Sequence, residues 1–149
     1  MELQQSIIIN RPIEEVFDVA TCHERCVVWR GPIVGAQKTS DGPTGVGSSY
    51  RHTLTLLGQQ VETEPVITAW EPPHRAEFEN RKGPATYKSV FVLEPVEEGT
   101  KLTTGIQIEI IGIYKHIPNV LVKQAAYRQH KADLQSLKEL MESGTEIKV

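Results

Sequence analysis

Apolar and polar residues alternate most clearly in the stretch KLTTGIQIEI, residues 101–110. Successive side chains of a β-strand point to opposite faces, so a period of two predicts a strand with one dry face and one wet face. The even positions are expected on the dry face: Leu102, Thr104, Ile106, Ile108 and Ile110.

Similar strand patterns recur along the chain up to about residue 112. They are LQQSIII near the N-terminus, then PIVGAQKT, YRHTLTLLG, QQVETEPVITAW, RAEFENR and ATYKSVFVLEP, followed by KLTTGIQIEIIG. Short turns such as EPPH and VEEGT join neighbours, which favours antiparallel pairing because parallel strands need longer crossover connections. By the same alternation we expect inward faces formed by Tyr50, His52 and Leu54, by Ala76 and Phe78, and by Tyr87, Ser89, Phe91 and Leu93.

A helical pattern follows the first strand. NRPIEEVFDVA places Pro12 in a first helical turn, with Glu14 and Glu15 at the positive end of the helix dipole. A second short helix is predicted to continue to Trp29. Two short helices therefore separate the first strand from the others.

The last third of the chain predicts one long helix, from about Pro118 to Ser143 and ended by Gly144. Its apolar stripe is aliphatic in the C-terminal half, but the N-terminal half turns polar groups toward the sheet. Two interpretations stay open: a wet cavity lies under the helix, or the helix start overhangs the sheet and meets solvent. The stripe consists of Val120, Lys123, Tyr127, His130, Leu134, Leu137 and Met141.

Length and charge narrow the class of protein. A chain of 149 residues fits one domain, spanning 1–149. The net charge of −3 has no basic block, so nucleic acid is not an expected partner. The N-terminus lacks the features of a signal peptide, and no apolar run approaches the roughly 20 residues of a membrane-spanning segment. We expect a cytoplasmic protein; the pattern does not indicate its oligomeric state.

Both cysteines lie in the stretch TCHERCVVWR, residues 21–30. If residues 13–29 formed one helix, Cys22 and Cys26 would share a face while His23 pointed away from it. A zinc site there would be two ligands short, and cytoplasmic cysteines are normally reduced. We interpret both cysteines as small packing residues, and we expect neither a metal nor another cofactor.

Five segments together resemble a known family. They are RPIEEVFDVATCHERCVVW, GVGSSYRHTLTLLGQQV, VITAWEPPHRAEF, LEPVEEGTKLT and HKADLQSLKELME. Their order is similar to that of the START-like, Bet v 1-like superfamily (SRPBCC), and within it to the polyketide cyclase/dehydrase and lipid transport group. The resemblance implies an α+β helix-grip fold. In that fold a curved antiparallel sheet of about seven strands wraps around the long C-terminal helix, with two short helices after the first strand.

A helix-grip fold implies an apolar pocket between the sheet and the long helix, which is the usual form of a small-molecule site. Pro65 could introduce a bulge that changes the side on which Trp70 lies. The expected lining residues are Tyr50, His52, Leu54, Trp70, Phe78, Tyr87, Phe91, Ile106, Tyr127 and His130.

Three functions remain open from the sequence. In the first, the pocket binds or carries a hydrophobic or amphipathic small molecule, with Tyr87, Tyr127 and His130 orienting its polar end. In the second, a cyclase- or dehydratase-like enzyme transfers a proton with His52, Tyr87 or His130. In the third, the protein acts through its surface as a regulatory or protein-interaction module.

Overall fold

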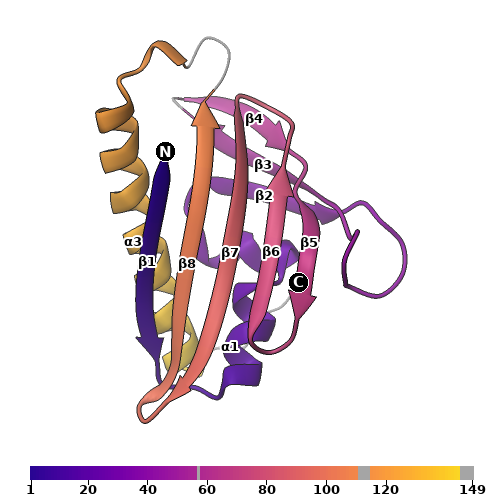
Figure 1. The fold of residues 1–149 in the computed structure, drawn as a ribbon, viewed down its shortest axis with the longest axis vertical. Helices are drawn as coiled ribbons and strands as arrows, with labels where there is room; N and C mark the ends of the chain where they lie inside the picture. The colour runs from indigo at the N-terminus through magenta and orange to yellow at the C-terminus, as the bar shows by residue number, and fades with distance from the viewer. Residues whose placement is uncertain (57, 111–114, 145–149) are drawn as a thin grey trace.

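Figure 1 shows the computed structural model of the chain, which describes residues 1–56, 58–110 and 115–144. The strands are β1 (Glu2–Ile9), β2 (Ile33–Lys38), β3 (Tyr50–Leu56), β4 (Gln59–Thr63), β5 (Val66–Glu71), β6 (Arg75–Asn80), β7 (Ala85–Val96) and β8 (Gly99–Ile110). The helices are α1 (Ile13–Ala20), the 3-10 turn η1 (His23–Arg25), α2 (Cys26–Trp29) and α3 (Asn119–Glu142). Residues 111 and 112, expected at the end of the last strand, lie outside the described residues.

The strands form two antiparallel sheets, of order β1-β8-β7-β6-β5 and β2-β3-β4. The segment QQVETEPVITAW, expected as one strand, is divided at Glu64 and Pro65 between the two sheets. Proline has no N–H to donate to a ladder, and the N–H of Glu64 instead donates to Oδ1 of Asn80 at 2.8 Å. An isolated bridge between Ser49 and Val66 lies next to this division.

Buried hydrophobic residues form a core cluster toward the end of the molecule where β7 turns into β8. There α1 and the C-terminal half of α3 cover the inner face of the larger sheet (Figure 1). The predicted inward positions of β6 and β7 are confirmed, because Ala76, Phe78, Phe91 and Leu93 are buried. The aliphatic half of the α3 stripe is also confirmed: its buried residues are Leu134, Leu137 and Met141.

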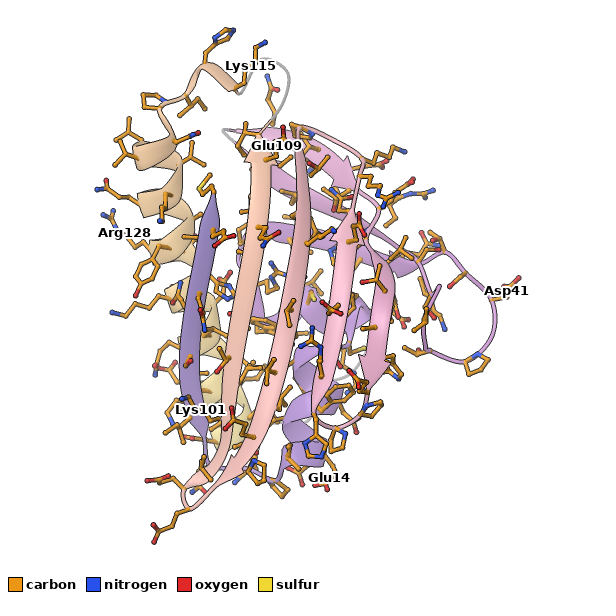
Figure 2. The ribbon with its side chains drawn as sticks, viewed as in Figure 1. Glu14, Asp41, Lys101, Glu109, Lys115 and Arg128 are labelled. Atoms are coloured by element: carbon orange, nitrogen blue, oxygen red, sulfur yellow. The ribbon has the colours of Figure 1, made fainter. Side chains whose placement is uncertain are left out.

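Helix α3 runs antiparallel to β8, and its described polar contacts to the sheet lie mainly beside β1. The side chain of Lys138 donates to the carbonyl of Ile8 at 2.6 Å, and the N–H of Asn10 donates to Glu142 at 2.8 Å. Figure 2 shows Arg128 on the side of α3 that faces away from the sheet. Within the described ranges, the helices are too short or too polar to cross a membrane.

The first turns of α3 extend into solvent. Val120 is 62% exposed, Leu121 56% and Tyr127 47%. Of the two interpretations of the polar helix start, the structure therefore matches the overhang. The side chain of Tyr127, expected to line a pocket, is exposed, and its backbone carbonyl accepts a hydrogen bond of 2.8 Å from Gln5.

Candidate functional site

The segment between α1 and β2 inserts His23 into the core. Helix α1 ends at Ala20, where both the backbone N–H and the hydroxyl of Thr21 donate to the carbonyl of Phe17. Cys22 is extended, so residues 13–29 do not form the single helix considered above. His23 is consequently 2% exposed, and its ring stacks on Phe78 with centroids 3.9 Å apart.

Burial leaves the thiol of Cys26 neutral. Desolvation raises its pKa to about 11, and its sulfur lies 3.7 Å from the carbonyl of Cys22. Both cysteines are free, as expected for packing residues. Across the described residues, no group of three or more His, Cys, Asp or Glu side chains could hold a metal ion.

His52 and Tyr50 of β3 enclose His23 from the smaller sheet. Nε2 of His52 donates to the carbonyl of His23 at 3.1 Å, and the two imidazole rings stack at 4.8 Å. The pKa of His52 falls to about 4, first through burial and second through the positive charge of Arg30. At neutral pH this imidazole is therefore uncharged and serves mainly as part of a packed aromatic cluster.

His130 makes a polar contact between α3 and β8. It lies nearer the start of the helix than Asp133, Lys138 and Glu142, which anchor the later turns. Its Nε2 lies 2.6 Å from Oγ1 of Thr104; the threonine is buried and the histidine is half-buried. Burial, followed by the charge of Arg30, lowers the pKa of His130 to about 4. Like His52, this histidine is neutral at physiological pH.

Beyond this contact the inner face of β8 is less completely covered. Leu102 is 0% exposed and Thr104 is 4% exposed, whereas Ile106, Ile108 and Ile110 are only half-buried. Helix α3 changes in the same direction: Leu134 is buried, whereas the first turns of the helix, toward its N-terminus, are exposed. The sheet thus continues as an apolar inner surface where the helix no longer packs tightly against it. We refer to Ile106, Ile108 and Ile110 as the isoleucine strip.

Arg30 follows α2 directly and was not singled out from the sequence. Its guanidinium carbon lies 5.7 Å from the ring centroid of Trp29, and its N–H caps α2 through the carbonyl of Cys26 at 2.8 Å. The next residue fixes the turn against α3, because the N–H of Gly31 donates to Asp133 at 3.0 Å. The available sequence signal was an arginine directly after the tryptophan that ends a short helix.

Tyr87 lies on β7 opposite Ile108, next to the isoleucine strip. Burial raises the pKa of its phenol, while the charge of Arg30 and a hydrogen bond with the Thr63 side chain act in the opposite direction. The hydroxyl therefore stays protonated at neutral pH and can donate a hydrogen bond.

The predicted lining residues separate into groups. Tyr50, His52, Phe78 and Phe91 are buried with His23 and belong to the packed interior. Trp70 packs on Phe17 at 5.0 Å, and the bulge that affects its strand lies between Ile67 and Ala69 rather than at Pro65. The half-buried members, which lie outside that filled interior, are Leu54, Tyr87, Ile106 and His130.

Two open hollows lie mainly away from the space between sheet and helix. One of about 600 Å³ is lined chiefly by outward-facing residues around Gly105, including Glu77, Lys88 and Val90, although Ile106 also borders it. The other, of about 290 Å³, lies between α1 and the end of α3. Neither hollow is the enclosed pocket that the resemblance implied. A ligand site on the inner face is therefore best sought at its open end.

Comparison with known proteins agrees with this geometry. Residues 1–142 match the sequence model of the family described as polyketide cyclase / dehydrase and lipid transport. No curated protein matches the chain.

Solved structures share the fold at low identity. TTHA0849 from Thermus thermophilus is 19% identical with a TM-score of 0.82, over 98% of this chain and 100% of that one. A START superfamily protein from Mycobacterium smegmatis is 16% identical with a TM-score of 0.82, over 97% and 99%. Ara h 8.0201 is 14% identical with a TM-score of 0.72, over 96% and 98%. The chain therefore belongs to the polyketide cyclase/dehydrase and lipid transport family and has the START-like, Bet v 1-like helix-grip fold.

Proposed function

We propose that the chain binds a hydrophobic or amphipathic small molecule against the inner face of β7 and β8, at the open end beside α3. The observation that supports this most directly is the isoleucine strip, which continues the dry face of β8 past the last tight contact with the helix. A ligand covering these half-buried side chains would remove apolar surface from water, which favours binding by about 25 cal/mol for each Å² covered.

The alternation along β8 supports a specific role for this surface. Gln107 and Glu109 occupy the outer face, while the intervening inner positions remain isoleucine to the end of the strand. Figure 2 shows Glu109 near the end of β8. An inner face exposed only to solvent would carry polar residues at these positions, because exposed apolar strips favour association.

Two neutral polar groups flank the strip and would orient the ligand. Tyr87 offers a phenolic donor from β7, and His130 offers an imidazole from α3. Tyr127, expected to share this role, is omitted because of its exposure.

Catalysis by proton transfer has weaker support. His52 and His130 are each hydrogen-bonded to protein partners, and in the described part of the chain no hydrogen bond joins them to each other or to Tyr87. With pKa values of about 4, both imidazoles are weak bases at neutral pH. Binding does not require these three side chains to meet at one point, nor a histidine pKa near neutral pH. We therefore propose binding without a reaction.

The test is uptake of a neutral apolar dye, N-phenylnaphthylamine, whose fluorescence rises in an apolar site. We expect saturable uptake by the native chain and a loss of affinity of at least about tenfold in Ile108→Glu, which places a charge on the strip. Ile8→Glu is the matched control. Ile8 is 40% exposed on the outer face of β1, which points away from the core and from the isoleucine strip. It should bind like the native chain.

Two results together would contradict the proposal: no saturable dye uptake by the native chain, and no bound molecule in native mass spectra after gentle purification. Thermal unfolding of both variants separates loss of the site from loss of the fold.

A further inference from the structure

Arg30 places a positive charge at the turn between α2 and β2. Its charge affects the pKa values of His23 on η1, His52 on β3, Tyr87 on β7 and His130 on α3. Arg30 is half-buried, and its guanidinium carbon lies 5.7 Å from the ring centroid of the buried Trp29, so the charge lies at the edge of the interior.

This charge has no anionic partner in the part of the chain that the structure describes. Arg30 is absent from its ion pairs: the carboxylate of Asp133, which accepts hydrogen bonds at Oδ1 from Gly31 at 3.0 Å and from Gln129 at 2.8 Å, is not within ion-pair distance of the guanidinium. Cys26 offers a hydrogen-bonding contact, but its thiol is neutral. A partly desolvated cation without a counter-charge is unfavourable, and an anion entering the site would relieve this cost.

A second donor without a partner lies in the same turn. Nε1 of Trp29 is buried and has no hydrogen-bond acceptor among the described residues. The guanidinium of Arg30 lies over the ring of this tryptophan. The charge of Arg30 also acts on Tyr87, which lies opposite Ile108, so the turn and this phenol together provide donors and a positive charge for a ligand on the strip.

We propose that the site selects an amphipathic anion, with an acidic head group such as a carboxylate paired to Arg30 and an apolar body on the isoleucine strip. This inference rests on the proposed binding function and specifies its ligand class. The planar guanidinium is suited to the two oxygens of a carboxylate, which it can bind through two parallel hydrogen bonds.

The test compares ligands that differ only in the acidic group. Anilinonaphthalene sulfonate carries an anion on the skeleton of N-phenylnaphthylamine, and dodecanoate and dodecanol form a second pair that can be scored by dye displacement. We expect the native chain to bind each anion about tenfold to a hundredfold more tightly than its neutral counterpart. Arg30→Gln should abolish this preference while retaining the neutral dye.

Arg81→Gln is the matched control, with the same change of charge on a side chain that is 83% exposed. It should keep the native preference for anions. Arg30→Lys preserves the charge without the planar fork, so part of the preference should remain.

Each outcome decides between the two proposals. Equal affinity of the native chain for the anionic and neutral members of both pairs overturns the role of Arg30 and leaves the binding function intact. A preference that survives in Arg30→Gln overturns it as well. Failure of every probe to bind instead overturns the binding function. The native-chain comparison needs no variant, so it stands even if Arg30→Gln does not fold.

Discussion

The Nε2 atom of His130 lies 2.6 Å from Oγ1 of Thr104, and this hydrogen bond marks the level at which α3 leaves the sheet. Below it, Leu102 and Leu134 are buried in the core. Above it, the isoleucine strip on β8 and the first turns of α3 are both partly exposed. One polar contact therefore separates the part of the molecule that provides stability from the part proposed to bind a ligand.

Thr104→Val should weaken the attachment of α3. The substitution keeps the shape of the side chain but removes the hydrogen-bond partner of His130, at an expected cost of about 1 kcal/mol in the free energy of unfolding. Urea denaturation measures the change. Thr103→Val is the control on the outer face, where Thr103 bonds to Ser6 in an exposed position, and should cost less than about 0.5 kcal/mol. Equal losses in the two variants would refute the special role of Thr104.

Acid should destabilise the fold below about pH 6.5 through its buried histidines. The pKa values of His52 and His130 are about 4 in the folded chain against an ordinary value of 6.5, chiefly because of burial. The unfolded chain consequently binds more protons, so this stability is fully present above pH 6.5 and is lost as pH falls through about 4.

The measurement is the free energy of unfolding between pH 4 and pH 7, for the native chain and for His52→Gln and His130→Gln. We expect a shallower pH dependence in each variant, since each removes one titrating group. Parallel profiles in all three proteins would contradict this assignment.

The ring of His23 should matter for its volume and shape. His23→Ala leaves a gap against Phe78 and His52, with an expected loss of about 3 kcal/mol. His23→Phe retains an aromatic ring in the stack and should lose much less. Thermal or urea unfolding distinguishes the two, and an equally large loss in the phenylalanine variant would show that the imidazole nitrogens are needed.

Two glycines of β8 should respond in opposite directions to alanine. Gly99 has φ of 135°, and an added Cβ would collide with the carbonyl of Ile9, so Gly99→Ala should be strongly destabilising. Nothing lies within 4 Å of a Cβ added to Gly105, and Gly105→Ala should be neutral or stabilising by about 0.5 kcal/mol. Melting temperatures of the two variants test this contrast, and a matching change in both would contradict it.

The alternation of residues was sufficient to predict most strands and their inward faces. The pattern from Leu102 to Ile110 has one interpretation only, because a shift by one residue would bury Gln107 and Glu109. The division at Pro65 was less visible, since the apolar residues on its two sides form a pattern that a single strand would also show. The assignment of β4 and β5 to different sheets depends on long-range pairing.

The candidate site was harder to predict than the fold. Tyr127 and His130 belong to one helical stripe, but the point at which α3 departs from the sheet determines which of them is covered. The extended backbone of Cys22 positions His23, and the hydrogen bond that caps α2 positions Arg30. Such interruptions between short helices leave no periodic pattern in the sequence. Sequence periodicity describes faces of regular elements, whereas both of these side chains come from the ends of short ones.

The unequal anchoring of α3 affects how a guest molecule could be admitted. Lys138, Asp133 and Glu142 hold its later turns through contacts with Ile8, Gly31 and Asn10, while Val120 and Leu121 project into solvent. Movement of the turns before Tyr127 would expose more of the half-buried Val122 and Ala126 but would leave the anchored turns in place. Admission of a guest molecule to the isoleucine strip would thus require changes mainly at the start of α3, while its later turns stay anchored.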